Sequence, residues 1–321
     1  MKPIVPISKF EEGKTVQGFY LCVEKHLRRT RSGDLFIDLV LRDRTGQIHA
    51  KIWNKIEDFD KKFSKGDAVA AKGEVEYFLD RPQLTVKRIN KATVQNYARY
   101  GFDPALIVPI AAVDPKVMWK EVLKIIRSIK NPFLKKLSYN IYDSHKEKLL
   151  THPASVSVHH NYRSGFLEHV LTMLKSAKHL APQYDLDIDL VISGILLHDI
   201  GKLFSIKSEY QATHTDEGNL LGHIVIGRDM VRNEAKSIKK FPKDLLINIE
   251  HIILSHQGKY EWQSPKKPAF SEALFVHLID LLDSQMNIMD QAISKDQDLE
   301  DFTSKYNYYK IPLLKRPNAA K

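Results

Sequence analysis

The residues best suited to chemistry lie in the second half of the chain, where histidines and aspartates interrupt apolar segments. His198 and Asp199 are adjacent at the end of the apolar segment 188–198, His169 lies on an expected helix over 166–180, and Asp280 lies on another over 270–293. A buried carboxylate is costly without a partner, and a divalent cation is a natural one. The sequence therefore predicts a metal centre whose nitrogen and oxygen ligands suit Mn, Fe, Zn, Co or Mg.

Two further histidines extend this prediction to a second ion. His223 lies in Leu221-Gly-His-Ile-Val, and His256 lies in Ile253-Leu-Ser-His-Gln. If both converge on Asp199, that carboxylate could bridge two ions, and such a pair can clamp the attacking and leaving oxygens of a phosphoryl transfer. A lone histidine on an apolar face is more often a packed core residue, so a structural role stays open for each.

Four other residues near these positions are open to two roles. His159 and His160 precede the first ligand helix and either face a substrate or serve the fold. His251, five residues before His256, is expected to support the ligands or to lie at the surface. Asp283 follows Asp280 by about one helical turn. We expect it to support a ligand or face solvent, although the two aspartates could exchange roles.

The elements that must position these side chains fall into two groups along the chain. Alternating apolar and polar residues predict strands over 15–24, 35–42, 48–53, 68–78 and 83–89, with a short helix at 54–63. Five strands with a helix between the third and fourth are the order of an OB-fold barrel. We therefore expect an all-β OB-fold barrel over residues 1–92, a linker with leading helices over 93–150, and an all-α domain over 151–321.

Helical periodicity begins after residue 113. Asp114-Pro115 and Asn131-Pro132 each combine an N-cap residue with a proline at the first helical position, so both predict helix starts. From residue 151 onward we expect only helices and loops. The helices are expected over 166–180, 188–198, 222–238, 245–255 and 270–293.

Composition and charge indicate the class of protein and a partner. The 321 residues are 43% hydrophobic and 27% charged, as in soluble globular proteins, and are enough for two domains. One cysteine, Cys22, excludes an internal disulfide and favours the cytoplasm. We expect no secretory signal and no membrane association. The net charge is +10, and residues 1–100 hold 20 Lys and Arg against 13 Asp and Glu. This favours a polyanion partner or a merely soluble basic surface.

The expected barrel carries side chains that suit a single-stranded nucleic acid. Phe36, His49, Lys51 and Trp53 fall on the strand faces opposite the apolar ones, where rings could stack on bases. Arg28, Arg29 and Arg31 lie in an expected basic loop that could follow phosphates. Alternatively, Phe36 or Trp53 packs against the linker or the helical domain, or the barrel serves mainly as a protein contact.

Three motifs carry a resemblance to a known family. They are His159-His-Asn-Tyr-Arg-Ser-Gly-Phe-Leu-Glu-His169, Leu196-Leu-His-Asp-Ile-Gly-Lys202 and Ser255-His-Gln-Gly-Lys-Tyr-Glu-Trp-Gln-Ser-Pro265. The order His, His-Asp, Asp is the signature of the HD phosphohydrolase superfamily. Together with the strand segments Gly33–Gly46 and Ala50–Trp53, the motifs resemble the YhaM-type 3′→5′ exoribonucleases, in which an OB-fold precedes an HD domain. The resemblance covers residues 5 to 290.

This resemblance implies specific roles. His169, His198, Asp199 and Asp280 would be the core metal ligands, and His223 and His256 would hold a second metal. Asp199 and Lys202 would act in catalysis, with Lys202 stabilising phosphate charge. The sequence departs from the family pattern at Gln257, where a histidine is expected, at Ser164-Gly165, where two glycines are expected, and at Phe166, where a leucine is expected. Gln257 makes the second metal the weaker expectation.

The resulting prediction is a metal-dependent 3′→5′ exonuclease that degrades single-stranded RNA, and also single-stranded DNA, to mononucleotides. One or two Mn²⁺ ions are expected, with other transition metals as alternatives, and the chain could form a homo-oligomer. The polarity and the RNA preference come from the resemblance alone. Two alternatives stay open. One is an HD phosphohydrolase acting on small nucleotides with a regulatory OB domain, and the other is a binding protein with an inactive HD domain.

Overall fold

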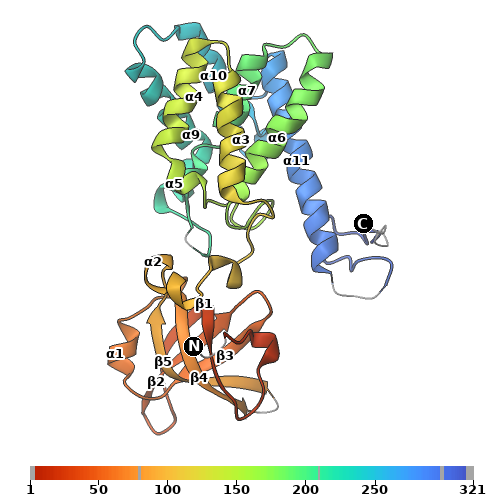
Figure 1. The fold of residues 1–321 in the computed structure, drawn as a ribbon. Helices are drawn as coiled ribbons and strands as arrows, with labels where there is room; N and C mark the ends of the chain where they lie inside the picture. The colour runs from red at the N-terminus through yellow and green to blue at the C-terminus, as the bar shows by residue number, and fades with distance from the viewer. Residues whose placement is uncertain (1–3, 79–80, 209, 297–299, 316–321) are drawn as a thin grey trace. The chain divides into compact units, whose positions relative to one another are not determined.

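The computed structural model describes residues 4–78, 81–208, 210–296 and 300–315. The chain divides into two compact units, Met1–Ile110 with Ser208–Gln211, and Ala111–Lys207 with Ala212–Lys321. The first is a β-barrel and the second is helical (Figure 1). Residues 93–110, expected to begin a linker, group with the barrel, whereas residues 111–150 group with the helices.

The first unit is a closed five-stranded barrel with the strand order β1-β2-β3-β5-β4. Alternate side chains of β2 point into the barrel, and Ile37, Leu39 and Leu41 are therefore buried in its core. The parallel pairing of β3 with β5 closes the barrel, and α1 links β3 to β4. This confirms the predicted OB-fold barrel. Its elements are η1 Ile7–Lys9, β1 Thr15–Arg29, β2 Leu35–Arg42, β3 Gln47–Ile52, α1 Ile56–Asp60, β4 Ala68–Phe78 and β5 Arg81–Lys91.

Two features of the barrel differ from expectation. β1 runs to Arg29 and stays paired with β2, so Arg28 and Arg29 lie on a strand rather than in a loop. Residues 93–110 form α2 Val94–Tyr97, η2 Ala98–Tyr100 and η3 Pro104–Leu106, which cover Phe19 on β1. The rings of Phe19 and Phe102 lie 4.9 Å apart between centroids. Burying these apolar groups holds the segment on the barrel.

The second unit is a helical bundle with one short β-ladder. Asp114 and Asn131 cap their helices as expected: Asp114 accepts the backbone N–H of Lys116, and Asn131 accepts those of Phe133 and Leu134. The prediction of helices and loops alone was wrong in one detail, because β6 pairs with β7. No helix in the described part of the chain is long and apolar enough to cross a bilayer. The elements are α3 Pro115–Ser128, α4 Pro132–Ser144, α5 Lys146–Leu149, α6 Gly165–Leu180, η4 Ala181–Gln183, α7 Ile188–Leu197, α8 Lys202–Ser205, β6 Ile206–Lys207, β7 Thr213–His214, α9 Asp216–Ser237, α10 Lys243–Ser255, η5 Tyr260–Trp262 and α11 Ser271–Lys295.

Helix α7 occupies the centre of this bundle. It contacts α3, α4, α6, α10 and α11, which explains why Leu190, Val191, Ile195, Leu196 and Leu197 are all buried. A helix that is apolar on every side is stable only when other helices surround it. Its carboxyl end therefore delivers His198 and Asp199 to the interior of the unit.

Two glycines shape the chain around His198 and Asp199. A Cβ atom on Gly201 would lie 2.0 Å from the carbonyl oxygen of His223, so only glycine lets α9 approach the turn after Asp199 this closely. Gly222 has a φ of 74° and marks a kink inside α9, directly before His223. Positive φ is readily adopted by glycine. Both residues help place His223 beside Asp199.

Candidate metal centre

The six predicted ligands lie together inside the helical unit. His169 comes from α6, His198 and Asp199 from the end of α7, His223 from α9, His256 from the end of α10, and Asp280 from α11. They form two groups, His169 with His198 and Asp280, and Asp199 with His223 and His256. Within each group the candidate ligand atoms lie within 4.8 Å of one another. The bundle thus brings together all six residues.

Asp199 connects the two groups through its two carboxylate oxygens. Oδ2 lies 3.3 Å from His198 Nε2, whereas Oδ1 lies 3.2 Å from His223 Nε2 and 3.4 Å from His256 Nε2. Asp280 Oδ1 lies 3.4 Å from His169 Nε2. Because each oxygen of Asp199 faces a different group, this carboxylate is placed to bridge two ions.

Hydrogen bonds at the outer nitrogens orient three of the histidines. His169 Nδ1 donates to Asp283 Oδ2 at 2.7 Å. His198 Nδ1 and His256 Nδ1 each donate to a backbone carbonyl of their own helix at 2.8 Å. With Nδ1 carrying a proton, the neutral ring keeps its lone pair on Nε2, which points to the centre. Metal-binding histidines are typically held in this way.

Several inward-facing atoms are buried without a hydrogen-bond partner among the described residues. They are Nε2 of His169, His198 and His223, and Oδ1 of Asp199. Leaving a buried polar atom unpaired costs about 1–3 kcal/mol. A cation bound among these atoms would satisfy all of them, so the donor set fits a divalent metal.

Charges in the centre keep its carboxylates ionised. Burial tends to raise the pKa of Asp199, but Lys202 and His198 hold that pKa well below its usual range. The pKa of Asp280 is lowered as well, since His169 and His198 outweigh the effect of burial. Burial tends to lower the pKa of His169, yet Asp280 and Asp283 raise it to about 9. A metal ion at Nε2 would compete with a proton for this nitrogen.

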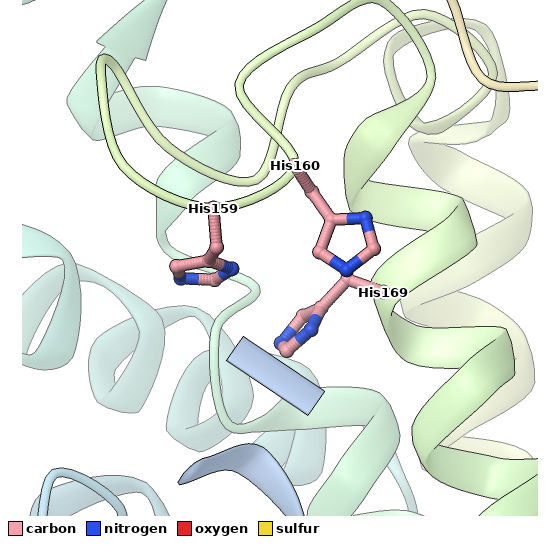
Figure 2. Close-up of side chains that lie close together, drawn as sticks. All are labelled: His159, His160 and His169. Atoms are coloured by element: carbon pink, nitrogen blue, oxygen red, sulfur yellow. The ribbon is translucent and has the colours of Figure 1, made fainter. Parts of the chain in front are cut away.

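A hydrogen-bonded network supports His169 from behind. Asp283 Oδ2 accepts from His169 and, at 2.9 Å, from His160 Nε2. His160 Nδ1 lies 3.1 Å from a carboxylate oxygen of Glu168, to which Tyr162 also donates. Asp283 and His160 therefore support a ligand, whereas Asp280 faces the centre directly. Figure 2 shows His160 and His169 side by side.

His159 differs from its neighbour. Its ring lies 5.0 Å from that of His169, and its buried Nδ1 has no hydrogen-bond partner in the described segments (Figure 2). Burial, helped by the charge of Lys202, holds the pKa of His159 well below its usual value, so the ring is neutral. It also lines the pocket beside the centre. These contacts favour a role toward a substrate.

A pocket of about 270 Å³ opens beside the ligands. Lys202 lines it with its ammonium 2.5 Å from Asp199 Oδ2, which places a cation at the pocket wall. Trp262 and Tyr308 also line it, and the sequence patterns did not single them out. Trp262 belongs to the motif Ser255–Pro265 and lies on η5, and Tyr308 lies in a turn near the carboxyl end of the described chain, so no ligand spacing pointed to either. The remaining wall consists of Ser155, Val158, His159, His256, Gln257, His277, Asp280, Leu281, Ser284, Gln285 and Ile288.

Gln257 contacts a candidate ligand, whereas His251 lies away from the ligand groups. The Gln257 amide donates to His256 Nε2 at 3.1 Å, so it occupies the nitrogen that a second metal would need. His251 Nε2 instead accepts from the backbone of Ala269 at 3.0 Å, and its ring lies 5.2 Å from that of Phe270. Among the described residues, His251 belongs to no ligand group. It holds the turn that leads into α11.

The barrel has an exposed aromatic and basic patch. The rings of Phe36 and Trp53 stack with centroids 4.9 Å apart, and Trp53 is 41% exposed. The Lys51 ammonium lies 5.6 Å, 5.3 Å and 5.4 Å from the ring centroids of Phe36, Trp53 and Phe78. We name these four residues the barrel patch. Trp53 thus packs on Phe36 and still keeps an exposed face. Phe78 was not expected from the sequence.

The three arginines and His49 are not part of the barrel patch as defined, but Arg28 pairs with Phe36 across β1 and β2, and His49 precedes Lys51 by two residues on β3. Arg28 pairs with Asp38 at 3.0 Å, and Arg29 donates to the backbone carbonyl of Gly33 at 2.8 Å. Arg31 lies exposed in the turn between β1 and β2, and His49 is exposed on β3. Arg28 and Arg29 already have hydrogen-bond acceptors within the barrel. They are therefore weaker candidates for phosphate contacts than we expected from the sequence.

Comparison with protein families assigns both units. Residues 166–285 match the HD domain model, and residues 21–92 match the model of the OB-fold nucleic acid binding domain. The chain therefore consists of an amino-terminal OB-fold domain followed by an HD domain. The HD domain indicates a metal-dependent phosphohydrolase and implies divalent metal binding. All six candidate ligands lie within the matched HD residues.

Solved structures similar to this chain include three replication proteins. The second OB-fold domain of replication protein A from Methanococcus maripaludis is 22% identical, with 28% of this chain and 94% of that chain covered and a TM-score of 0.24. A replication factor A related protein from Methanobacterium thermoautotrophicum is 24% identical, with 29% and 96% covered and a TM-score of 0.25. A replication protein A heterotrimer bound to ssDNA is 14% identical, with 31% and 74% covered and a TM-score of 0.22. The fold assignment rests on the strand order and the family models.

Proposed function

We propose that this protein is a metal-dependent 3′→5′ exonuclease that hydrolyses single-stranded RNA, and also single-stranded DNA, to mononucleotides. The observation that carries the proposal is the six-ligand centre, whose unpaired buried nitrogen and oxygen atoms adjoin an open pocket. The same chain carries an OB-fold with an exposed aromatic and basic patch. The 3′→5′ polarity and the RNA preference rest on the resemblance to the YhaM-type exoribonucleases.

The metal would be held by the two ligand groups that share Asp199. We propose Mn²⁺ as the ion to test first, since the mixed imidazole and carboxylate set suits Mn, Fe, Zn, Co or Mg. When bound, such an ion supplies charge stabilisation for phosphoryl oxygens and lowers the pKa of an attacking water. His169, His198 and Asp280 form the better prepared group. In the other group, Gln257 competes for His256 Nε2.

Side chains around the pocket position the substrate. The Lys202 ammonium can stabilise negative charge on a phosphoryl oxygen, since it is nearly buried and faces the pocket. His159 is neutral, and its unpaired Nδ1 can hydrogen-bond a phosphate oxygen. Asp283 and His160 keep His169 in position without contacting the substrate.

The barrel patch would retain the strand between successive cleavages. A stacked base contributes about 1–3 kcal/mol and requires no particular sequence. Trp53 offers an exposed ring face, and Lys51 adds a positive charge close to both rings. This combination suits binding without sequence preference.

The test uses the metal-loaded full chain and matched RNA and DNA strands. With a 5′ label, 3′→5′ cleavage gives a ladder of progressively shorter strands, and with a 3′ label the first product is a labelled mononucleotide. Intact strands combined with hydrolysis of free nucleotides would support the small-nucleotide alternative and contradict the proposal. Asp199→Ala should abolish cleavage and leave strand binding intact. Asp290→Ala, on an exposed site of α11, should retain both.

A further inference from the structure

Two aromatic side chains line the pocket beside the metal ligands. Trp262 lies on η5 and is 42% exposed, and Tyr308 lies in the segment 300–315, which we call the tail, and is 59% exposed. The Lys259 ammonium lies 4.5 Å from the centroid of the Trp262 ring, and the Tyr309 ring packs edge-on against Tyr308 at 5.4 Å, so each pocket residue has one such neighbour and keeps exposed surface. We propose that Trp262 and Tyr308 hold the base of the strand's 3′-terminal nucleotide by stacking. This inference rests on the proposed nuclease activity.

The tail is an ordered part of the helical unit. Tyr309 donates from its hydroxyl to the backbone carbonyl of Gln285 at 2.9 Å, and the backbone N–H of Ser304 donates to Asp296 at 2.9 Å. Thr303 and Leu313 are buried, and Thr303 N–H donates to the Leu313 carbonyl at 2.8 Å. These bonds fasten the tail beside the carboxyl end of α11 (Figure 1). Tyr308 is thereby held at the pocket, next to the anchored Tyr309.

A second hollow of about 520 Å³ lies next to the pocket. Val158, Ile288 and Tyr308 line both, so the two adjoin. Polar side chains of α11 and the tail, including Gln291 and Asn307, line the second hollow. A strand whose terminal base lies in the pocket thus has room to continue along α11.

The residues of the pocket wall are of two chemical kinds. Of the candidate ligands, His256 and Asp280 line it, and with Lys202 and His159 they form a set suited to a phosphate. The other set is aromatic and aliphatic, with Trp262, Tyr308, Leu281 and Ile288, and it includes the polar Ser284 and Gln285. A nucleobase attached to that phosphate has flat apolar faces and a polar edge, so it matches this second set. Stacking tolerates any base, as an exonuclease that removes every nucleotide requires.

The test compares the first cleavage step on three 5′-labelled RNA strands. One is intact, one lacks the base of its 3′-terminal nucleotide, and one lacks the penultimate base. We expect the metal-loaded natural chain to lose about tenfold in kcat/KM on the strand without a terminal base. Tyr308→Ala and Trp262→Ala should each lose activity on the intact strand and discriminate much less against the missing terminal base. Tyr308→Phe keeps the ring and should keep the discrimination.

Tyr260→Ala is the matched control. Tyr260 is 58% exposed, lies on the same short helix as Trp262, and is absent from the described lining of the pocket. This variant should retain the activity and discrimination of the natural chain. Metal content and melting temperature, measured for every variant, show whether the centre and the fold survive. If Tyr308→Ala fails to fold, Trp262→Ala on a different segment decides the matter.

Three outcomes would overturn the inference and leave the nuclease proposal standing. The natural chain could remove a terminal nucleotide with or without its base equally fast, both alanine variants could keep full discrimination, or the loss could be confined to the penultimate base. If the metal-loaded natural chain cleaves none of the three strands, the proposed function fails, and the inference fails with it.

Discussion

Replacing Asp283 by asparagine tests how strongly the carboxylate behind His169 supports metal binding. Asp283 is nearly buried, and its Oδ2 accepts from His169 Nδ1 at 2.7 Å and from His160 Nε2 at 2.9 Å. The two histidines lower the pKa of Asp283 to about 2 despite burial, so it is ionised throughout the neutral range. Asparagine preserves the shape and one acceptor oxygen but removes the charge. Hydrogen bonds to a charged acceptor are roughly twice as strong as neutral ones.

We expect Asp283→Asn to weaken metal binding about 10–100-fold, as is typical when the partner of a ligating histidine is changed. At 1.36 kcal/mol per tenfold, this corresponds to about 1.4–2.7 kcal/mol. The measurement is the Kd for Mn²⁺ by competition with a fluorescent chelator, together with the Mn²⁺ concentration that half-saturates cleavage. Cleavage at saturating Mn²⁺ should fall less than the affinity.

Asp290→Asn makes the same change at an exposed position of the same helix and should leave metal affinity unaltered. If folded Asp283→Asn binds Mn²⁺ as tightly as the natural chain, the argument that Asp283 orients and polarises His169 is wrong.

Three further predictions follow from the centre and the barrel patch. Trp53→Ala should weaken binding of single-stranded RNA by about 1–3 kcal/mol, measured by fluorescence anisotropy, and an unchanged Kd would remove Trp53 from the interface. Removing metal with a chelator should lower the melting temperature, because an ion that binds only the folded state stabilises it, and added Mn²⁺ should restore it. Gln257→Ala frees His256 Nε2 from its amide donor and should tighten the weaker metal site about fivefold in a calorimetric titration, whereas weaker binding would show that Gln257 supports the site.

Local patterns in the sequence determined the elements and the class of site. The alternation in β2 depends only on which residues face the core, and the caps at Asp114 and Asn131 depend only on neighbouring backbone groups. The order of strands and helix predicted the OB-fold barrel, which the strand pairing and the family model confirm. An aspartate after an apolar helix signalled a buried charge that needs a cation, because this cost is set by burial alone.

Pairings between distant segments were decided by the tertiary structure. Asp280 and Asp283 are both carboxylates on α11, and only the packing of α6 against α11 determines that Asp283 meets Nδ1 of His169 while Asp280 meets Nε2. The extension of β1 through Arg29 likewise depends on pairing with β2, which provides hydrogen-bond partners for its backbone.

The amino-acid sequence by itself determined the two domain types and the choice of candidate metal ligands, since residue type and short-range periodicity indicate both. Only the tertiary structure decided that the Gln257 amide occupies His256 Nε2 and that Tyr308 reaches the pocket. Tyr308 lies far along the chain from the first ligand helix. Its position depends on where the tail is fastened to α11 by bonds such as that from Tyr309 to Gln285, and no local pattern encodes such a long-range contact.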